Sequence, residues 1–238
     1  MSDEATERLR HLWLEYVDAT GPGGHIDYLV WYYANDDGDE DFPPSNLQEK
    51  YPNEDYMDNI CEFIGRCTNL ESLGLRATHY LDLQGLVWKP ASTGLKHIYM
   101  HRAYIDFDVL KRLLSAADGE ASNIVAMSLN FVELLDHTWK DVFDHLMRAD
   151  AMRYLNISDL NYARFGESAE FRSYSYRPTT DTCVIWTEND ADEEGLDDVV
   201  KKILDAGGCV SDNLDSQAVN AGYKSSDWKI ITGHERRL

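Results

Sequence analysis

The sequence predicts an α/β protein in which short parallel strands alternate with helices. The main observation is an apolar-x-x-apolar-x-apolar pattern that occurs four times, with successive copies starting 25, 29 and 28 residues apart. A second observation is the amphipathic helical pattern that follows the second and third copies. This form and period are typical of an irregular leucine-rich-repeat solenoid, whose stacked units cover each other's apolar sides. The copies are Leu70, Leu73 and Leu75; Leu95, Ile98 and Met100; Ile124, Met127 and Leu129; and Met152, Leu155 and Ile157.

The third copy shows the expected design of one unit. Its strand, IVAMSLNFVEL, points Met127 and Leu129 inward, because side chains alternate along a strand. The helix that follows, DHTWKDVFDHLMR, has Thr138 at its expected N-cap position. The apolar face of this helix consists of Trp139, Val142, Phe143 and Leu146.

Two further segments fit the same design. The second copy predicts a strand at LKHIYMHRAYI and a helix at FDVLKRLLSAA, and NEDYMDNICEFIGRCTNL predicts the helix of an earlier unit. The apolar positions of these helices are Val109, Leu110, Leu113 and Leu114 in the second copy, and Met57, Ile60, Cys61, Phe63 and Ile64 in the earlier unit.

The N-terminal part predicts divergent units. RLRHLWLEYV fits the strand template, and HIDYLVWYY predicts another strand, although only 17 residues separate Leu9 from Ile26. That spacing is too short for a full strand and helix. Residues 35–49 form an acidic loop that contains Pro and Gly. The expected inward residues are Leu9, Leu12, Leu14 and Val17 in the first segment, and Ile26, Leu29 and Trp31 in the second.

The C-terminal part departs from the pattern, as the cap of a solenoid does. Residues 163–181 are polar and predict a long connection. TCVIWTEN then predicts a strand, and EEGLDDVVKKILDAGG predicts a helix that ends at its two glycines, Gly207 and Gly208. The rest predicts mostly loop, with a short strand at WKIIT. The expected division is a divergent N-terminal part at 1–52, the repeat array at 53–162, and a capping unit with a tail at 163–238.

The composition limits the possible partners. The chain has 238 residues, 43% of them hydrophobic, and a net charge of −21. Such a surface repels phosphate backbones and anionic lipid, and the sequence has no basic run to offset it, so we expect neither a nucleic acid nor a membrane partner. Acidic charge attracts basic proteins, but it also simply serves solubility.

Localisation follows from what the sequence lacks. No stretch approaches the roughly 18 apolar residues of a membrane span, and the acidic start does not match a signal peptide. None of the four cysteines belongs to a C-x-x-C pair, which favours reduced thiols. We therefore expect a cytoplasmic or nuclear protein.

The repeats resemble the leucine-rich-repeat region of fungal F-box-type proteins, over roughly residues 53–205. The resemblance implies a repeat fold and, through the F-box of such proteins, docking on a ubiquitin-ligase adaptor. No F-box is evident in this chain, so adaptor binding is expected only if one precedes it in a longer form. The usual repeat asparagine is also replaced, by Thr78, Ala103, Val132 and Leu160. The segments that carry the resemblance are LESLGLRATHY, LKHIYMHRAYIDFDVLKRLL, residues 138–143 and MRYLNISDLNYA.

The outward strand positions form the candidate binding surface. On the concave face of a solenoid they combine Tyr, Arg and His side chains, which suit protein recognition. If the first segment also stacks, it adds His11, Trp13 and Glu15. The alternative is that these positions are inert, since every strand has an outward side. The expected partner-binding residues are Arg76, His97, Tyr99, His101, Ser128, Asn130, Tyr154 and Asn156.

Other chemistry has little support in the sequence. His97 and His101 would lie about 13 Å apart on a strand, too far to share one metal ion. The DDGDED segment lacks the spacing of a calcium loop, and GPGG lacks the lysine of a phosphate-binding loop. No catalytic motif is present. We therefore expect no metal, no cofactor and no enzymatic activity. Three alternatives stay open: a ubiquitin-ligase substrate receptor or its truncated relative, an enzyme with a site in 163–238, and a gene fragment.

Overall fold

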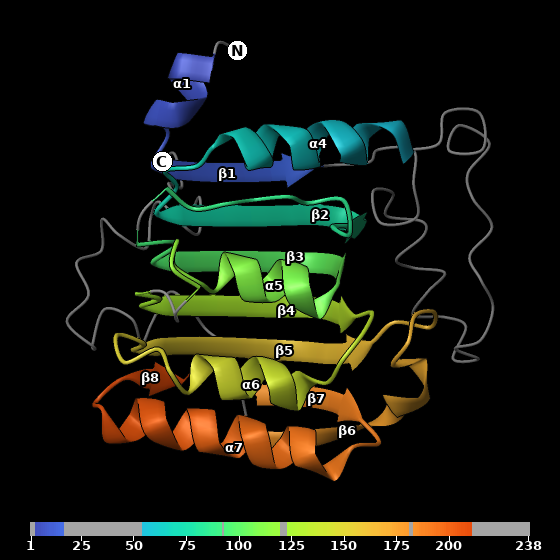
Figure 1. The fold of residues 1–238 in the computed structure, drawn as a ribbon. Coiled ribbons are helices and arrows are strands. Elements are labelled where there is room, and N and C mark those ends of the chain that lie inside the picture. Colours follow the sequence, from blue (N-terminus) through green and yellow to red (C-terminus); the bar gives the residue numbers. More distant parts are fainter. Residues whose placement is uncertain (1–2, 17–53, 92, 120–122, 181–182, 211–238) are drawn as a thin grey trace, which may run out of the picture.

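The computed structural model describes residues 3–16, 54–91, 93–119, 123–180 and 183–210. In these residues, strands and helices form a mixed α/β fold around one mostly parallel sheet (Figure 1). The helices are α1 (Asp3–Arg8), α4 (Glu54–Arg66), α5 (Phe107–Leu113), α6 (Trp139–Leu146) and α7 (Asp190–Asp205). The strands are β1 (His11–Tyr16), β2 (Ser72–Asp82), β3 (His97–Ile105), β4 (Ala126–Leu134), β5 (Tyr154–Tyr162), β6 (Arg172–Thr180), β7 (Cys183–Thr187) and β8 (Cys209–Val210).

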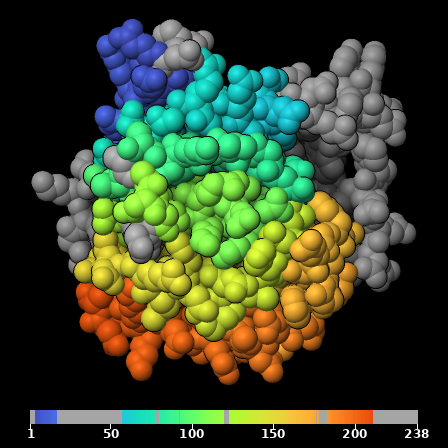
Figure 2. All heavy atoms as spheres, viewed as in Figure 1, coloured from blue at the N-terminus to red at the C-terminus, as the bar shows by residue number. Residues whose placement is uncertain are grey.

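The strands are ordered β1-β2-β3-β4-β5-β7-β6, and β8 also pairs with β5. All the pairs are parallel except β6 with β7. Because consecutive parallel strands need a crossover connection, α4, α5 and α6 each return the chain between two neighbouring strands. Helices α4 to α7 lie on the same face of the sheet (Figure 1), and side chains of successive segments cover that face in chain order (Figure 2).

The apolar pattern accounts for the core between the sheet and the helices. Its second and third positions line up in register across β2 to β5, and all of them are buried. Leu12 and Leu14 of β1 extend the same two rows, so the expected strand in the first segment is confirmed. The rows are Leu73, Ile98, Met127 and Leu155, then Leu75, Met100, Leu129 and Ile157.

The predicted helices are confirmed, and their ends have the expected chemistry. Thr138 caps α6: its hydroxyl accepts a hydrogen bond from the Asp141 N–H at 3.2 Å, and the Asp141 carboxylate accepts one from the Thr138 N–H at 3.0 Å. The glycines end the last helix as expected, with α7 stopping at Asp205 and Gly207 left-handed at φ 73°.

The strands carry a feature that the apolar pattern does not predict. Arg102, Phe131 and Asp159 have left-handed backbones, with φ of 63°, 53° and 56°, at equivalent positions of β3, β4 and β5. Each inserts one extra residue on the side away from the core, so that burial resumes at the next position.

The insertion lies beside three of the positions at which the family resemblance predicts an asparagine. Ala103, Val132 and Leu160 occupy its place, but the strands continue through these buried positions instead of turning. Ala103 and Val132 are partners in the β3–β4 ladder, so both positions stay within the sheet without an asparagine side chain.

The C-terminal prediction needs one correction. Residues 163–181 are not a plain connection, because they contain a short 3-10 helix (Ala169–Phe171) and the strand β6. The antiparallel pairing of β6 with β7 stabilises a segment whose polar sequence gives no strand signal. The expected strands at HIDYLVWYY and WKIIT, the acidic loop at 35–49 and the C-terminal tail lie outside the described residues.

Candidate functional site

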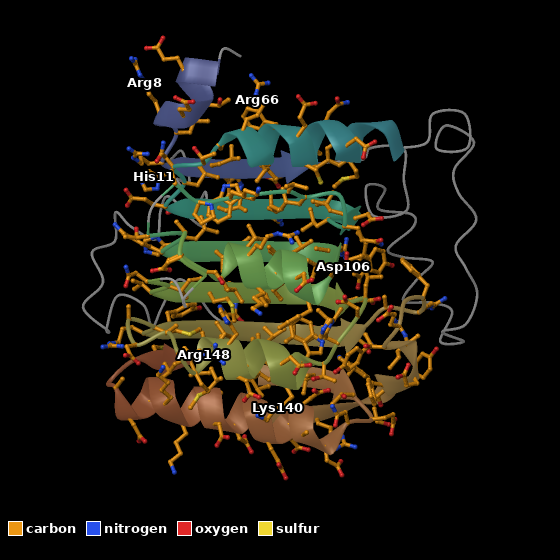
Figure 3. All side chains as sticks on the ribbon, in the orientation of Figure 1. Arg8, His11, Arg66, Asp106, Lys140 and Arg148 are labelled. Atoms are coloured by element: carbon orange, nitrogen blue, oxygen red, sulfur yellow. The ribbon has the colours of Figure 1, made fainter. Side chains whose placement is uncertain are left out.

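The candidate site is the sheet face opposite the helices, here called the polar face. All the predicted binding residues lie on it, because strand register brings their outward positions into three rows. The amino ends of the strands, marked by His11, and the carboxyl ends, marked by Asp106 after β3, lie at opposite edges (Figure 3). The rows are His11, Ser72, His97, Ala126 and Tyr154; Trp13, Gly74, Tyr99, Ser128 and Asn156; and Glu15, Arg76, His101, Asn130 and Ser158.

The first row contains a hydrogen-bonded chain of three side chains. The Ser72 hydroxyl lies 3.0 Å from Nδ1 of both His11 and His97. Because a hydroxyl has one proton, Ser72 donates to one imidazole and accepts from the other. A serine between two imidazoles resembles an activated nucleophile, but Ser72 is only 4% exposed, which limits the approach of a substrate to its hydroxyl. These two hydrogen bonds therefore connect β1, β2 and β3.

The second row begins with an aromatic pair over a glycine. A Cβ atom placed on Gly74 would lie 2.1 Å from the Trp13 ring, so the indole rests directly on the β2 backbone. The Tyr99 ring packs beside it, with ring centroids 5.0 Å apart and an interplanar angle of 35°. The sequence shows this only as a glycine inside a strand, which often marks a close approach.

The far end of the first two rows is buried, whereas Asn130 and Ser158 of the third row stay partly exposed. Asn130 and Asn156 both donate to the Ser128 hydroxyl, at 2.9 and 3.2 Å. Ser128, Asn156 and Tyr154 are 2%, 4% and 0% exposed. These three residues lie on the predicted face, but they are not accessible to a partner in this structure. In the first two rows, the partly or fully exposed side chains therefore lie on β1 and β3.

The third row combines an ion pair with a half-buried imidazole. Arg76 and Glu15 lie 3.6 Å apart, and both are about half exposed. Burial, together with nearby Arg102, lowers the pKa of His101 to about 4. Its ring packs edge-on against Phe131, which also lies under the Arg102 guanidinium at 5.6 Å. Arg102 and Phe131 reach this surface through the left-handed insertion, which is why sequence alternation missed them.

A second cluster lies towards the carboxyl ends of the strands. Arg172 donates to the Glu133 carboxylate at 3.0 Å and to the Tyr162 carbonyl at 2.6 Å. Burial raises the pKa of Glu133, although Arg172 acts against it. The Tyr80 and Tyr104 rings stack beside it at 4.6 Å. No sequence signal joins residues so far apart, and this cluster is largely buried.

Two further kinds of site, a metal site and a membrane span, are absent from the residues that the structure describes. Within the described ranges, no three His, Cys, Asp or Glu side chains are grouped so that they could hold a metal ion. His97 and His101 lie on one strand, as predicted, in rows one and three. None of the helices placed by the structure has the length and apolar character needed to cross a membrane.

Comparisons with known proteins add no assignment. No protein-family model matches the chain, and no curated protein or solved structure matches it. The case for a function therefore depends on the polar face itself.

Proposed function

We propose that this chain is a non-catalytic interaction protein, an irregular leucine-rich-repeat solenoid that binds a protein partner on its concave face. The observation that carries the proposal is the parallel register of β1, β2 and β3. It brings partly exposed Trp13, Arg76 and Tyr99 together from three separate strands. The proposed concave face is the polar face.

The solenoid assignment is supported by the order of the strands. β1 to β5 follow one another in the sheet as they do in the chain, and the four copies of the apolar pattern share one core. Stacked repeats bury their apolar sides in this way, since each unit contacts only its neighbours.

The composition of the polar face suits protein recognition. Trp, Tyr and Arg are the residue types that most often dominate binding energy at interfaces. Trp13 and Tyr99 already pack on each other, and Arg76 is paired with Glu15. Side chains held in place before binding lose less conformational entropy when the partner arrives.

Topology favours binding over catalysis. In open α/β sheets, ligand crevices form where the strand order reverses and connections leave on opposite faces. β1 to β5 are strictly sequential, and α4 to α7 lie on one face (Figure 1). This part of the sheet therefore has no switch point at which such a crevice would open.

Affinity purification with mass spectrometry from the source cell tests the proposal. The bait is the native chain beside an Arg76→Ala, Tyr99→Ala variant, with Arg148→Ala, Leu204→Ala as the control, because both control residues are exposed and lie at the helices, Arg148 just after α6 and Leu204 in α7. We expect the first variant to lose a specific partner that the control retains. Retention of every partner by both variants rejects this face. Recovery of a ubiquitin-ligase adaptor would instead favour the substrate-receptor alternative.

A further inference from the structure

We infer, independently of any partner, that helices α5 and α6 are capped at both ends by side chains of the unit that follows each of them in the chain. The unit after α5 consists of β4 and α6, and the unit after α6 includes β7 and α7. The three helices lie side by side on one face of the sheet (Figure 1). The C-terminal unit therefore determines whether the ends of α6 stay helical.

Both helices are too short to be stable by themselves. α5 has seven residues and α6 has eight, whereas isolated helices shorter than about 12 residues are marginal in water. The first N–H groups and the last carbonyls of any helix also lack partners inside it. Side chains from outside α5 and α6 therefore contribute directly to helix formation.

The unit of β4 and α6 supplies partners to both ends of α5. Asp106 stands at the N-cap position, but its side chain makes no cap hydrogen bond with the described amides of α5. Instead, Asp136 accepts a hydrogen bond from the Phe107 N–H, the first of the helix, at 2.6 Å. At the other end, His145 of α6 donates from Nε2 to the Leu114 carbonyl at 3.1 Å. An acidic group thus lies at the positive end of the helix dipole and a ring N–H at its negative end.

The C-terminal unit supplies the same arrangement to the amino end of α6. The fully buried carboxylate of Asp192 accepts a hydrogen bond from the Lys140 N–H at 2.8 Å and one from the Tyr162 hydroxyl at 2.7 Å. That hydroxyl in turn accepts one from the Trp139 N–H at 2.9 Å. Burial raises the pKa of Asp192, and its hydrogen bonds with Thr187 and Tyr162 oppose that rise. Since Asp192 belongs to the first turn of α7, one carboxylate lies at the amino ends of two helices.

The carboxyl end of α6 is contacted by Lys202, near the end of α7. Its Nζ donates to the carbonyls of Met147 and Ala149, at 2.7 and 3.1 Å. Asp192, Gly195 and Lys202 occupy positions i, i+3 and i+10 of α7, so they share one side of that helix. Gly195 allows the two helices to approach, because an added Cβ would lie 2.6 Å from a side chain of α6. α7 therefore fits α6 in one direction and one register.

Amide hydrogen exchange in the full chain, resolved by NMR, tests this dependence at each end of α6. Asp192→Asn keeps the shape of the side chain but removes its charge, so we expect exchange at the Lys140 amide to become about tenfold faster. Lys202→Met removes the ammonium group and keeps the stem. Exchange at Met147, in the last turn, should become about threefold faster.

Control variants separate capping from a general loss of packing. Asp198→Asn and Lys201→Met, both exposed on α7, should change neither rate. Leu196→Ala, on the buried side of α7, should instead speed exchange along the whole of α6. One unit earlier, Asp136→Asn should speed exchange at Phe107 of α5 and leave the last turn of α6 unchanged.

A milder variant tests the same contact if Asp192→Asn folds poorly. Tyr162→Phe removes a single hydroxyl, and exchange at the Trp139 amide should become faster. Acceleration confined to the contacted end of α6 supports capping by the following unit. Acceleration spread evenly along α6 in the Asp192 and Lys202 variants, or unchanged exchange at Lys140 and Trp139, overturns it.

Discussion

The polar face has two halves that differ in their access to water. In its first two rows, β1 and β3 carry partly or fully exposed His11, Trp13, His97 and Tyr99, whereas β4 and β5 carry buried Ser128, Tyr154 and Asn156. The third row is at least partly exposed on all five strands. All of these residues point away from the helix-side core. Strand alternation therefore gives the direction of a side chain, whereas the residues packed around it in space decide whether a partner can reach it.

The largest expected effect is a loss of folding stability in the buried half. Tyr154→Ala removes a fully buried ring, so we expect it to lower the free energy of unfolding by about 3–5 kcal/mol. Tyr99→Ala, in the accessible half, should cost clearly less. Urea denaturation followed by circular dichroism measures both. Equal losses in the two variants would show that the halves do not differ in packing.

The next prediction concerns the contact between Trp13 and Gly74 in the accessible half. Gly74→Ala forces the Trp13 ring off the β2 backbone, and we expect a cost of about 1–3 kcal/mol together with a shifted indole NMR signal. Gly85→Ala is the matched control, because the nearest atom to its added Cβ is 3.9 Å away. An unmoved Trp13 signal in Gly74→Ala would contradict the contact.

Folding stability should depend on pH through His101, which lies on β3 beside Asn130 of β4. Its pKa falls from 6.5 to about 4 in the folded chain, so the unfolded chain binds more protons between these values. The neutral His101 ring therefore contributes folding stability that is fully present above pH 6.5 and is lost as the pH falls towards 4. The partial exposure of the ring reduces the loss to about 1–2 kcal/mol.

The measurement compares unfolding of the native chain and His101→Asn from pH 7 to pH 4. The difference in stability between them should shrink or reverse with acid, because the variant lacks the titrating ring. A difference that stays constant across this range would rule out a depressed pKa at His101.

The smallest expected effect is at the surface ion pair. Arg76→Ala should change the free energy of unfolding by less than about 1 kcal/mol, since both partners are half exposed. Arg8→Ala, on α1, is a comparable exposed control. If Arg76→Ala weakens partner binding while the free energy of unfolding changes by less than about 1 kcal/mol, Arg76 serves binding and not folding stability. A stability loss like that of Tyr154→Ala would refute the assignment of Arg76 to an open surface.

Some parts of the fold lie beyond sequence reasoning for definable reasons. The left-handed insertions fall at Arg102, Phe131 and Asp159, and neither Arg nor Phe is a residue type that signals such a backbone. The same holds for Asp192, which is fully buried and accepts hydrogen bonds from Tyr162 and Thr187 at 2.7 Å. The Tyr162 contact joins residues 30 positions apart in the chain, so no local pattern contains it.

The sequence by itself determined strands β1 to β5 and β7, helices α4 to α7, the inward rows and the side of the sheet on which each candidate residue lies, but not strand β6. These properties follow from periodicity, which is local to one segment. Only the tertiary structure decided that Trp13 rests on Gly74, that Ser72 bridges two imidazoles, and that Tyr154 and its neighbours are buried. The physical reason is that exposure and contact depend on the register of several strands, which the separate segments adopt only when they pack together.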